Sequence, residues 1–140
     1  MSFIQDKVFS FLRKIFVPFA RFSLFVIFFW FGALKVVGQS PATPLVQHLF
    51  SQTISFMDFG TFLILFGLFE CLIGVLFLIK GREKWALSLL AIHMITTAGP
   101  LVLLPQETWS GFLVPTLEGQ YIIKNLAIIS AAIGLILQTV

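Results

Sequence analysis

Residues 54–79 read ISFMDFGTFLILFGLFECLIGVLFLI, an apolar run with an acidic residue, Glu70, deep inside it. A helix needs roughly 20 consecutive apolar residues to cross a bilayer. Working outward from this run, three further stretches meet that requirement, at residues 15–37, 85–104 and 117–140. We therefore predict an all-α, polytopic membrane protein, with residues 1–140 forming a single four-helix transmembrane domain.

Composition supports a lipid environment. Of the 140 residues, 59% are hydrophobic and only 11% are charged, and the mean hydropathy is +1.04. A soluble domain carries about a quarter charged residues. The net charge is +3, but the basic residues fall at the edges of the apolar runs rather than along one surface, which argues against a nucleic-acid partner. The single cysteine, Cys71, excludes an intrachain disulfide.

The first apolar run is expected to be a retained helix and not a cleaved signal peptide. It follows Lys7, Arg13 and Lys14 and continues to Gly38, whereas the apolar core of a signal peptide spans about 7–15 residues. Residues 3–15 are predicted to form a separate short helix in the membrane interface, because Ile4, Val8, Phe11, Leu12 and Ile15 cluster at helical spacing opposite the charged positions. A continuous extension of the first span is the alternative.

Basic residues predict the orientation. They precede the first span and recur in the turn KGREK at 80–84, whereas the connections at 38–53 and 105–116, expected to be polar loops, contain no Lys or Arg. Because basic segments favour the cytoplasmic side, we expect both termini and the 80–84 turn to be cytoplasmic. The expected main partner is the lipid bilayer.

Helical periodicity places the unusual residues of each span on one face. Gly60, Gly67 and Gly74 recur every seven residues beside Glu70. Glycines permit close approach of a neighbouring helix, so Glu70 is expected to face protein rather than lipid. The same reasoning predicts that the ionisable residues of the other spans point inward.

Depth, at about 1.5 Å per residue, sorts these groups into two predicted layers. A central layer holds Arg21, Glu70 and His93, and an outer layer holds Lys35 and Lys124. An ionisable group inside a membrane marks a paired network, an ion path or a reactive site. These five residues are therefore the candidate ligand-binding residues. No catalytic residue is assigned, and the spacing of His93, Glu70 and Cys71 does not predict a metal site.

Each candidate also has a structural explanation. Glu70 is a proton acceptor or a partner in an ion pair with Arg21, with His93, or with both. His93 is a proton-exchanging group or a hydrogen-bonded core residue. The two lysines either snorkel to lipid headgroups or bind an anionic or carbonyl-bearing ligand, in a predicted site between Lys35, Lys124 and the central layer.

Four segments together resemble the DoxX-like family of membrane proteins, especially its YkgB/RclC branch: RFSLFVIFFWFGALKVVGQSPATPLV from Arg21, GLFECLIGVLFL, TTAGPLVLLPQETW and LEGQYIIKNLAII. The resemblance covers about residues 20–138. It implies a four-helix bundle in a bacterial inner membrane, an association with redox or stress chemistry, and Arg21, Lys35, Glu70 and Lys124 as the characteristic polar positions.

Two kinds of function follow. In the first, a redox- or stress-associated subunit binds a quinone or a similar lipid-soluble or anionic molecule in the polar interior. Because the chain has no CxxC, haem-ligand, dinucleotide or flavin motif, we expect no cofactor within the chain other than a bound quinone. The protein would need a soluble partner for electrons, or would only dock the quinone, and a homo-oligomer is the other expected partner. In the second, the protein passes protons or a small anion, or is a membrane scaffold without catalytic activity.

Overall fold

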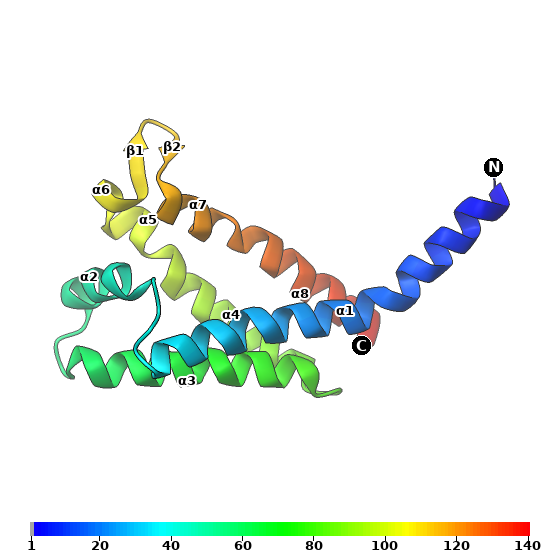
Figure 1. Cartoon of the computed structure of the whole chain (residues 1–140), viewed down its shortest axis with the longest axis horizontal. Coiled ribbons are helices and arrows are strands. Elements are labelled where there is room, and N and C mark those ends of the chain that lie inside the picture. Colours follow the sequence, from blue (N-terminus) through cyan, green and yellow to red (C-terminus); the bar gives the residue numbers. More distant parts are fainter. Residues whose placement is uncertain (1) are drawn as a thin grey trace.

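The computed structural model describes residues 2–140 and is built almost entirely of helices (Figure 1). In the described chain, four helical segments are long and apolar enough to cross a membrane, which confirms the predicted all-α bundle and identifies a multi-pass membrane protein. They are Phe3–Val36, Phe59–Leu78, Glu83–Leu103 and Leu117–Thr139.

Ten elements make up the described part of the chain, and some spans contain two of them. The elements are α1 (Ser2–Val36), α2 (Thr43–Thr53), α3 (Phe59–Leu78), α4 (Glu83–Ala98), α5 (Pro100–Leu103), α6 (Pro105–Thr108), β1 (Trp109–Gly111), β2 (Val114–Pro115), α7 (Leu117–Ile123) and α8 (Asn125–Thr139). The third span is divided where Pro100, which has no N–H, follows Gly99. The fourth is divided at Lys124.

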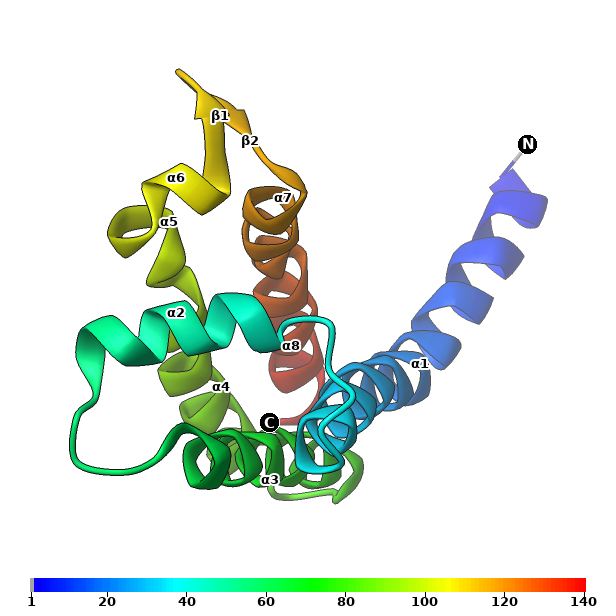
Figure 2. The same ribbon diagram turned by 60° about the vertical axis from the view of Figure 1, so that its left-hand side comes forward.

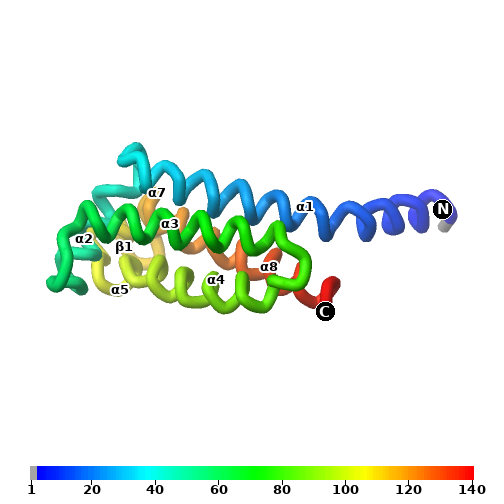
Figure 3. The backbone as a smooth tube through the Cα atoms, turned by 90° about the horizontal axis from the view of Figure 1, so that it is seen from below, coloured from blue at the N-terminus to red at the C-terminus, as the bar shows by residue number. Residues whose placement is uncertain are grey.

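The first two spans, α1 and α3, pack antiparallel along a seam of glycines, side by side in Figure 3. A Cβ atom added to Gly32 would stand 2.5 Å from the carbonyl oxygen of Gly67, and one added to Gly74 would stand 2.9 Å from the backbone nitrogen of Phe29. Any larger residue would push the helices apart. The predicted role of Gly67 and Gly74 is confirmed. Gly60 is exposed and contacts no other helix, so its predicted place in the seam was wrong.

An apolar core fills the centre of the bundle, where α1, α3, α4 and α8 meet. Its most buried large side chains include Leu24, Ile73, Phe77, Leu90 and Leu135. These residues come from all four spans, so the core depends on the whole bundle and not on one helix pair.

At one end of the bundle the connections are more ordered than expected. The predicted loop at 38–53 contains α2, which packs against α3 and α5 (Figure 2). Its His48 Nδ1 lies 2.5 Å from Glu107 Oε1. The predicted loop at 105–116 contains α6 and the β1–β2 hairpin, a short antiparallel pair. We call this the hairpin end.

The separate interfacial helix predicted for residues 3–15 does not form as an independent element, because these residues continue without a break into the first span as part of α1. The structure matches the alternative, a continuous extension of the first span, and this helix runs through Pro18, the only proline within α1. Figures 1 and 3 show the first part of α1 extending past the other helices, at the end opposite the hairpin. This end also contains the 80–84 turn, and we call it the basic end.

Candidate functional site

Three of the predicted residues meet inside the bundle around one carboxylate. Lys35 Nζ on α1 donates to Glu70 Oε2 on α3 at 2.7 Å. His93 Nε2 on α4 lies 2.7 Å from the other oxygen, Glu70 Oε1. The three side chains are at most 7% exposed. Glu70 therefore connects three spanning helices through two buried polar contacts.

The glycine seam positions this cluster. Gly32 precedes Lys35 by three residues, and Gly67 precedes Glu70 by three. Residues three apart lie on the same side of a helix, one turn along. Because the two helices run antiparallel, Lys35 and Glu70 lie on opposite sides of the contact between the two glycines. The base of Lys35 packs against Gly67, where an added Cβ would stand 3.0 Å from the Lys35 Cβ, and the long lysine side chain reaches across to Glu70.

Aromatic rings surround the imidazole of His93. The Phe66 ring stacks on it, with centroids 5.3 Å apart and planes 6° apart, and the edge of Phe28 meets it at 5.3 Å. Phe69 lies 6.3 Å away. The Lys35 ammonium is 5.6 Å from the centroid of the Phe66 ring. These rings exclude water, which strengthens the electrostatic interactions within the cluster.

One nitrogen in the cluster has no partner. Among the described residues, none forms a hydrogen bond with His93 Nδ1, although the atom is buried. An unsatisfied buried polar atom costs about 1–3 kcal/mol. When Nε2 carries the ring proton and donates it to Glu70, Nδ1 is an acceptor; in the imidazolium form both nitrogens donate. The site can therefore accept a proton or a hydrogen bond through Nδ1, next to a carboxylate that stabilises the imidazolium.

The predicted contact between Arg21 and Glu70 was wrong, whereas the predicted contact between His93 and Glu70 is confirmed. Arg21 instead forms a buried ion pair with Glu83 at the start of α4, and its Nη1 donates to the carbonyl oxygen of Phe77 at 2.9 Å. That carbonyl lies in the last turn of α3, where helix carbonyls lack intrahelical partners. Arg21 is 14 positions from Lys35 on α1, about 21 Å along the helix.

Glu83 was missed by the sequence analysis, which treated residues 80–84 only as a basic turn. The signal that identifies it is its position: Glu83 is the one acid in that turn, at the depth where Arg21 needs a partner. The partner of Lys35 was also missed, because Lys35 was expected in the outer layer with Lys124.

Lys124 does not belong to the buried cluster. It lies between α7 and α8 with an exposed side chain, and its ammonium stands 5.4 Å from the centroid of the Tyr121 ring. The predicted layer of two inward-facing lysines is therefore absent. The structure brings together Lys35, Glu70 and His93, and it separates Arg21 and Lys124 from them.

Within residues 2–140, no three His, Cys, Asp or Glu side chains are grouped closely enough to hold a metal ion. Cys71 lies on the glycine seam, where its Sγ is 3.5 Å from the carbonyl oxygen of Phe29. Comparisons of the chain with protein-family models, with curated proteins and with solved structures give no match. The chemistry of the buried cluster is therefore the basis for inferring a function.

Proposed function

We propose that this multi-pass membrane protein binds a quinone, or a similar lipid-soluble molecule with a carbonyl or acidic group, at the Lys35–Glu70–His93 cluster. The observation that carries the proposal is the buried, unpartnered Nδ1 of His93. A ligand oxygen bound at Nδ1 would satisfy it. The aromatic rings around the imidazole suit the flat ring of a quinone.

Proton exchange gives the cluster a role beyond binding. A quinol hydroxyl can donate to neutral Nδ1, and an imidazolium can donate to a quinone carbonyl. Glu70 lies 2.7 Å from both His93 and Lys35, so its carboxylate can balance the charge of an imidazolium. His93 is thus suited to hold the proton that a quinol releases or that a quinone takes up. Electrons would pass to or from a soluble partner protein.

A transmembrane proton path is less well supported by the same geometry. Each buried cluster has one residue on α4, namely His93 in one and Glu83 in the other. These two residues are ten positions apart, about 15 Å along the helix. Between them lie Ala86 and Leu90, which are 0% and 1% exposed. A proton passing from one cluster to the other would have to cross this apolar layer.

A scaffold role is the second candidate, and the ion pairs favour it. Arg21–Glu83 and Lys35–Glu70 both join α1 to other spans, so every one of these four charges has a partner on a different element. Removing one partner of such a pair costs about 3–5 kcal/mol. In this alternative the clusters fix the helix arrangement and bind no ligand.

The cellular setting is part of the proposal. The four segments that resemble DoxX-like proteins support a bacterial inner-membrane protein associated with redox or stress chemistry. The meeting of both basic segments at one end of the bundle supports a topology in which that end and both termini are cytoplasmic.

Quinone binding can be tested on the protein purified in mild detergent. Organic extracts are analysed by mass spectrometry for copurified quinone, and a short-chain ubiquinone analogue is then titrated. Substitution of His93 by phenylalanine keeps the aromatic packing and removes both ring nitrogens, so we expect affinity to fall at least about tenfold, the loss of one hydrogen bond to a buried group.

Lys124→Met is the matched control, because it removes a charge from an exposed side chain outside the cluster. We expect this variant to bind the analogue as the parent protein does. Equal affinity of the parent and His93→Phe, or no binding by either, would reject the quinone site and favour the scaffold.

A further inference from the structure

The first part of α1 is exposed along its length within the described chain. We define residues 3–15 as the N-terminal arm. Every residue of the arm is exposed, and Figures 1 and 3 show it extending beyond the bundle. Arg21 joins α1 to Glu83, so the arm begins beside the 80–84 turn at the basic end.

One side of the arm is an apolar stripe at helical spacing. Its residues are Ile4, Val8, Phe11, Leu12 and Ile15, with exposed fractions of 73%, 50%, 60%, 48% and 37%. A stripe of this kind is unfavourable in water, at roughly 25 cal/mol per Å² of apolar area. The stripe therefore needs a cover that the described chain does not provide.

The charges around the apolar stripe indicate what kind of surface covers it. The basic end presents six exposed bases, and Asp6 is the one exposed acid among the charged residues of the arm and the turn. The bases are Lys7, Arg13, Lys14, Lys80, Arg82 and Lys84. Glu83 is buried in its ion pair with Arg21 and does not offset them at the surface. An amphipathic helix flanked by bases fits an anionic lipid surface.

Length and bending allow the arm to reach that surface. The 35 residues of α1 span about 52 Å, whereas the hydrocarbon core is about 30 Å thick. The arm therefore extends beyond the core if α1 stays straight. Pro18 cannot donate a backbone hydrogen bond to the carbonyl of Lys14, and this missing bond makes the junction between the arm and the span the place where α1 can bend.

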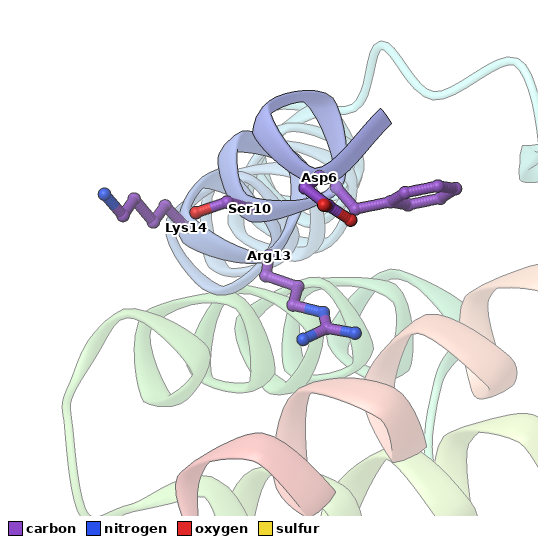
Figure 4. Close-up of a pocket in the computed structure, with 5 residues that line it drawn as sticks. Asp6, Ser10, Arg13 and Lys14 are labelled. Carbon is purple, nitrogen blue, oxygen red and sulfur yellow. The ribbon is translucent and has the colours of Figure 1, made fainter. Parts of the chain in front are cut away.

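We propose that the N-terminal arm lies on the bilayer surface at the basic end and binds anionic phospholipid headgroups. The apolar stripe enters the acyl region, and Lys7 and Lys14, two turns apart on one flank, contact lipid phosphates. Figure 4 shows Asp6, Ser10, Arg13 and Lys14 projecting from the arm, with Arg13 and Lys14 pointing in different directions. Together with Phe9, these residues line a shallow, open hollow on the surface of the arm. Headgroups can therefore be contacted on more than one side of the arm.

Spin labelling tests the depth of the arm. Nitroxides are placed at Leu12→Cys, on the stripe, or at Ser10→Cys, on the polar side, in a Cys71→Ala background. The protein is reconstituted in nanodiscs of phosphatidylcholine with and without phosphatidylglycerol. We expect the Leu12 label to be accessible to oxygen and the Ser10 label to a water-soluble nickel chelate, with a greater contrast when phosphatidylglycerol is present.

Lipid selectivity tests the charges. Native mass spectrometry of the protein released from mixed nanodiscs counts the retained phosphatidylglycerol. Lys7→Gln with Lys14→Gln should lower its preference over phosphatidylcholine about fivefold per base removed, whereas Lys124→Gln should leave it unchanged.

Two results would overturn the proposal. One is a Leu12 label that is as accessible to the nickel chelate as the Ser10 label in phosphatidylglycerol nanodiscs. The other is spin–spin broadening between Leu12 labels, which would assign the apolar stripe to a second copy of the chain. Neither result involves a quinone, so this test is independent of the proposed function.

Discussion

A double-mutant cycle on Lys35 and Glu70 tests the assignment of partners in the buried cluster. The variants are Lys35→Met, Glu70→Gln and the two combined. Methionine retains most of the apolar stem of lysine, and glutamine retains the shape of glutamate, so the changes remove charge while disturbing packing little. The same cycle on Arg21 and Glu70 tests the pairing that the sequence analysis predicted.

The expected magnitudes follow from burial and distance. Lys35 and Glu70 are 2.7 Å apart with side chains 7% and 6% exposed, and removal of one partner from such a pair costs about 3–5 kcal/mol. We expect the destabilisation by Lys35→Met to lie near the lower value, because His93 Nε2 still lies within hydrogen-bonding distance of Glu70. The double variant leaves no isolated charge. Its loss of unfolding free energy should therefore be smaller than the sum of the two single losses by about 2 kcal/mol or more.

Arg21 and Glu70 should behave independently. They lie in different clusters, and Arg21 is separated from Lys35 by about 21 Å along α1. Effects of distant residues without shared partners add to within about 0.5 kcal/mol. We therefore expect a coupling free energy close to zero between Arg21→Met and Glu70→Gln.

The free energies of unfolding can be measured by titrating the detergent-solubilised protein with sodium dodecyl sulfate and following helicity by circular dichroism. Lys124→Met serves as the control for removing an exposed positive charge. A coupling between Arg21 and Glu70 larger than that between Lys35 and Glu70 would refute the helix register described above.

Three further predictions concern other parts of the chain. Because the side chain of Asp58 accepts hydrogen bonds from Thr61 N–H and Oγ1–H, its pKa lies below the usual value; its cap is therefore intact above about pH 3.9 and is lost as the pH falls through the lowered pKa. The protection of the Thr61 amide against hydrogen exchange should fall as the cap is lost. In Asp58→Asn, this protection should no longer depend on pH. Gly67→Leu should lower the unfolding temperature in detergent, because even a Cβ there would lie 2.6 Å from a carbonyl oxygen of α1; an unchanged temperature would contradict the close seam. Cysteines at Ser51 and Ser110, in a cysteine-free background, should react with impermeant reagents from outside the cell, and labelling only from the cytoplasmic side would reverse the proposed topology.

The spans could be predicted from the sequence because their signal is local. Apolar runs long enough to cross a bilayer are visible in residue order alone, and all four are present in the structure. The seven-residue spacing of Gly67 and Gly74 identified a contact face on α3 for the same reason: helical periodicity sets how residues are distributed around an axis. The order in the two connections, α2 and the β1–β2 hairpin, was missed because their short elements depend on packing against the ends of the spans.

The pairing of charges could not be predicted, because it depends on the relative height of the helices. The inward face of α1 carries two cations, Arg21 and Lys35, and either could meet Glu70 if α1 slid along α3. Periodicity determines the face that each residue occupies, but it leaves this sliding free. The close contact between Gly32 and Gly67 sets the register, and it places Lys35 at Glu70. The sequence by itself therefore determined that the buried charges face inward, and only the packing of one helix backbone against another decided which charges meet.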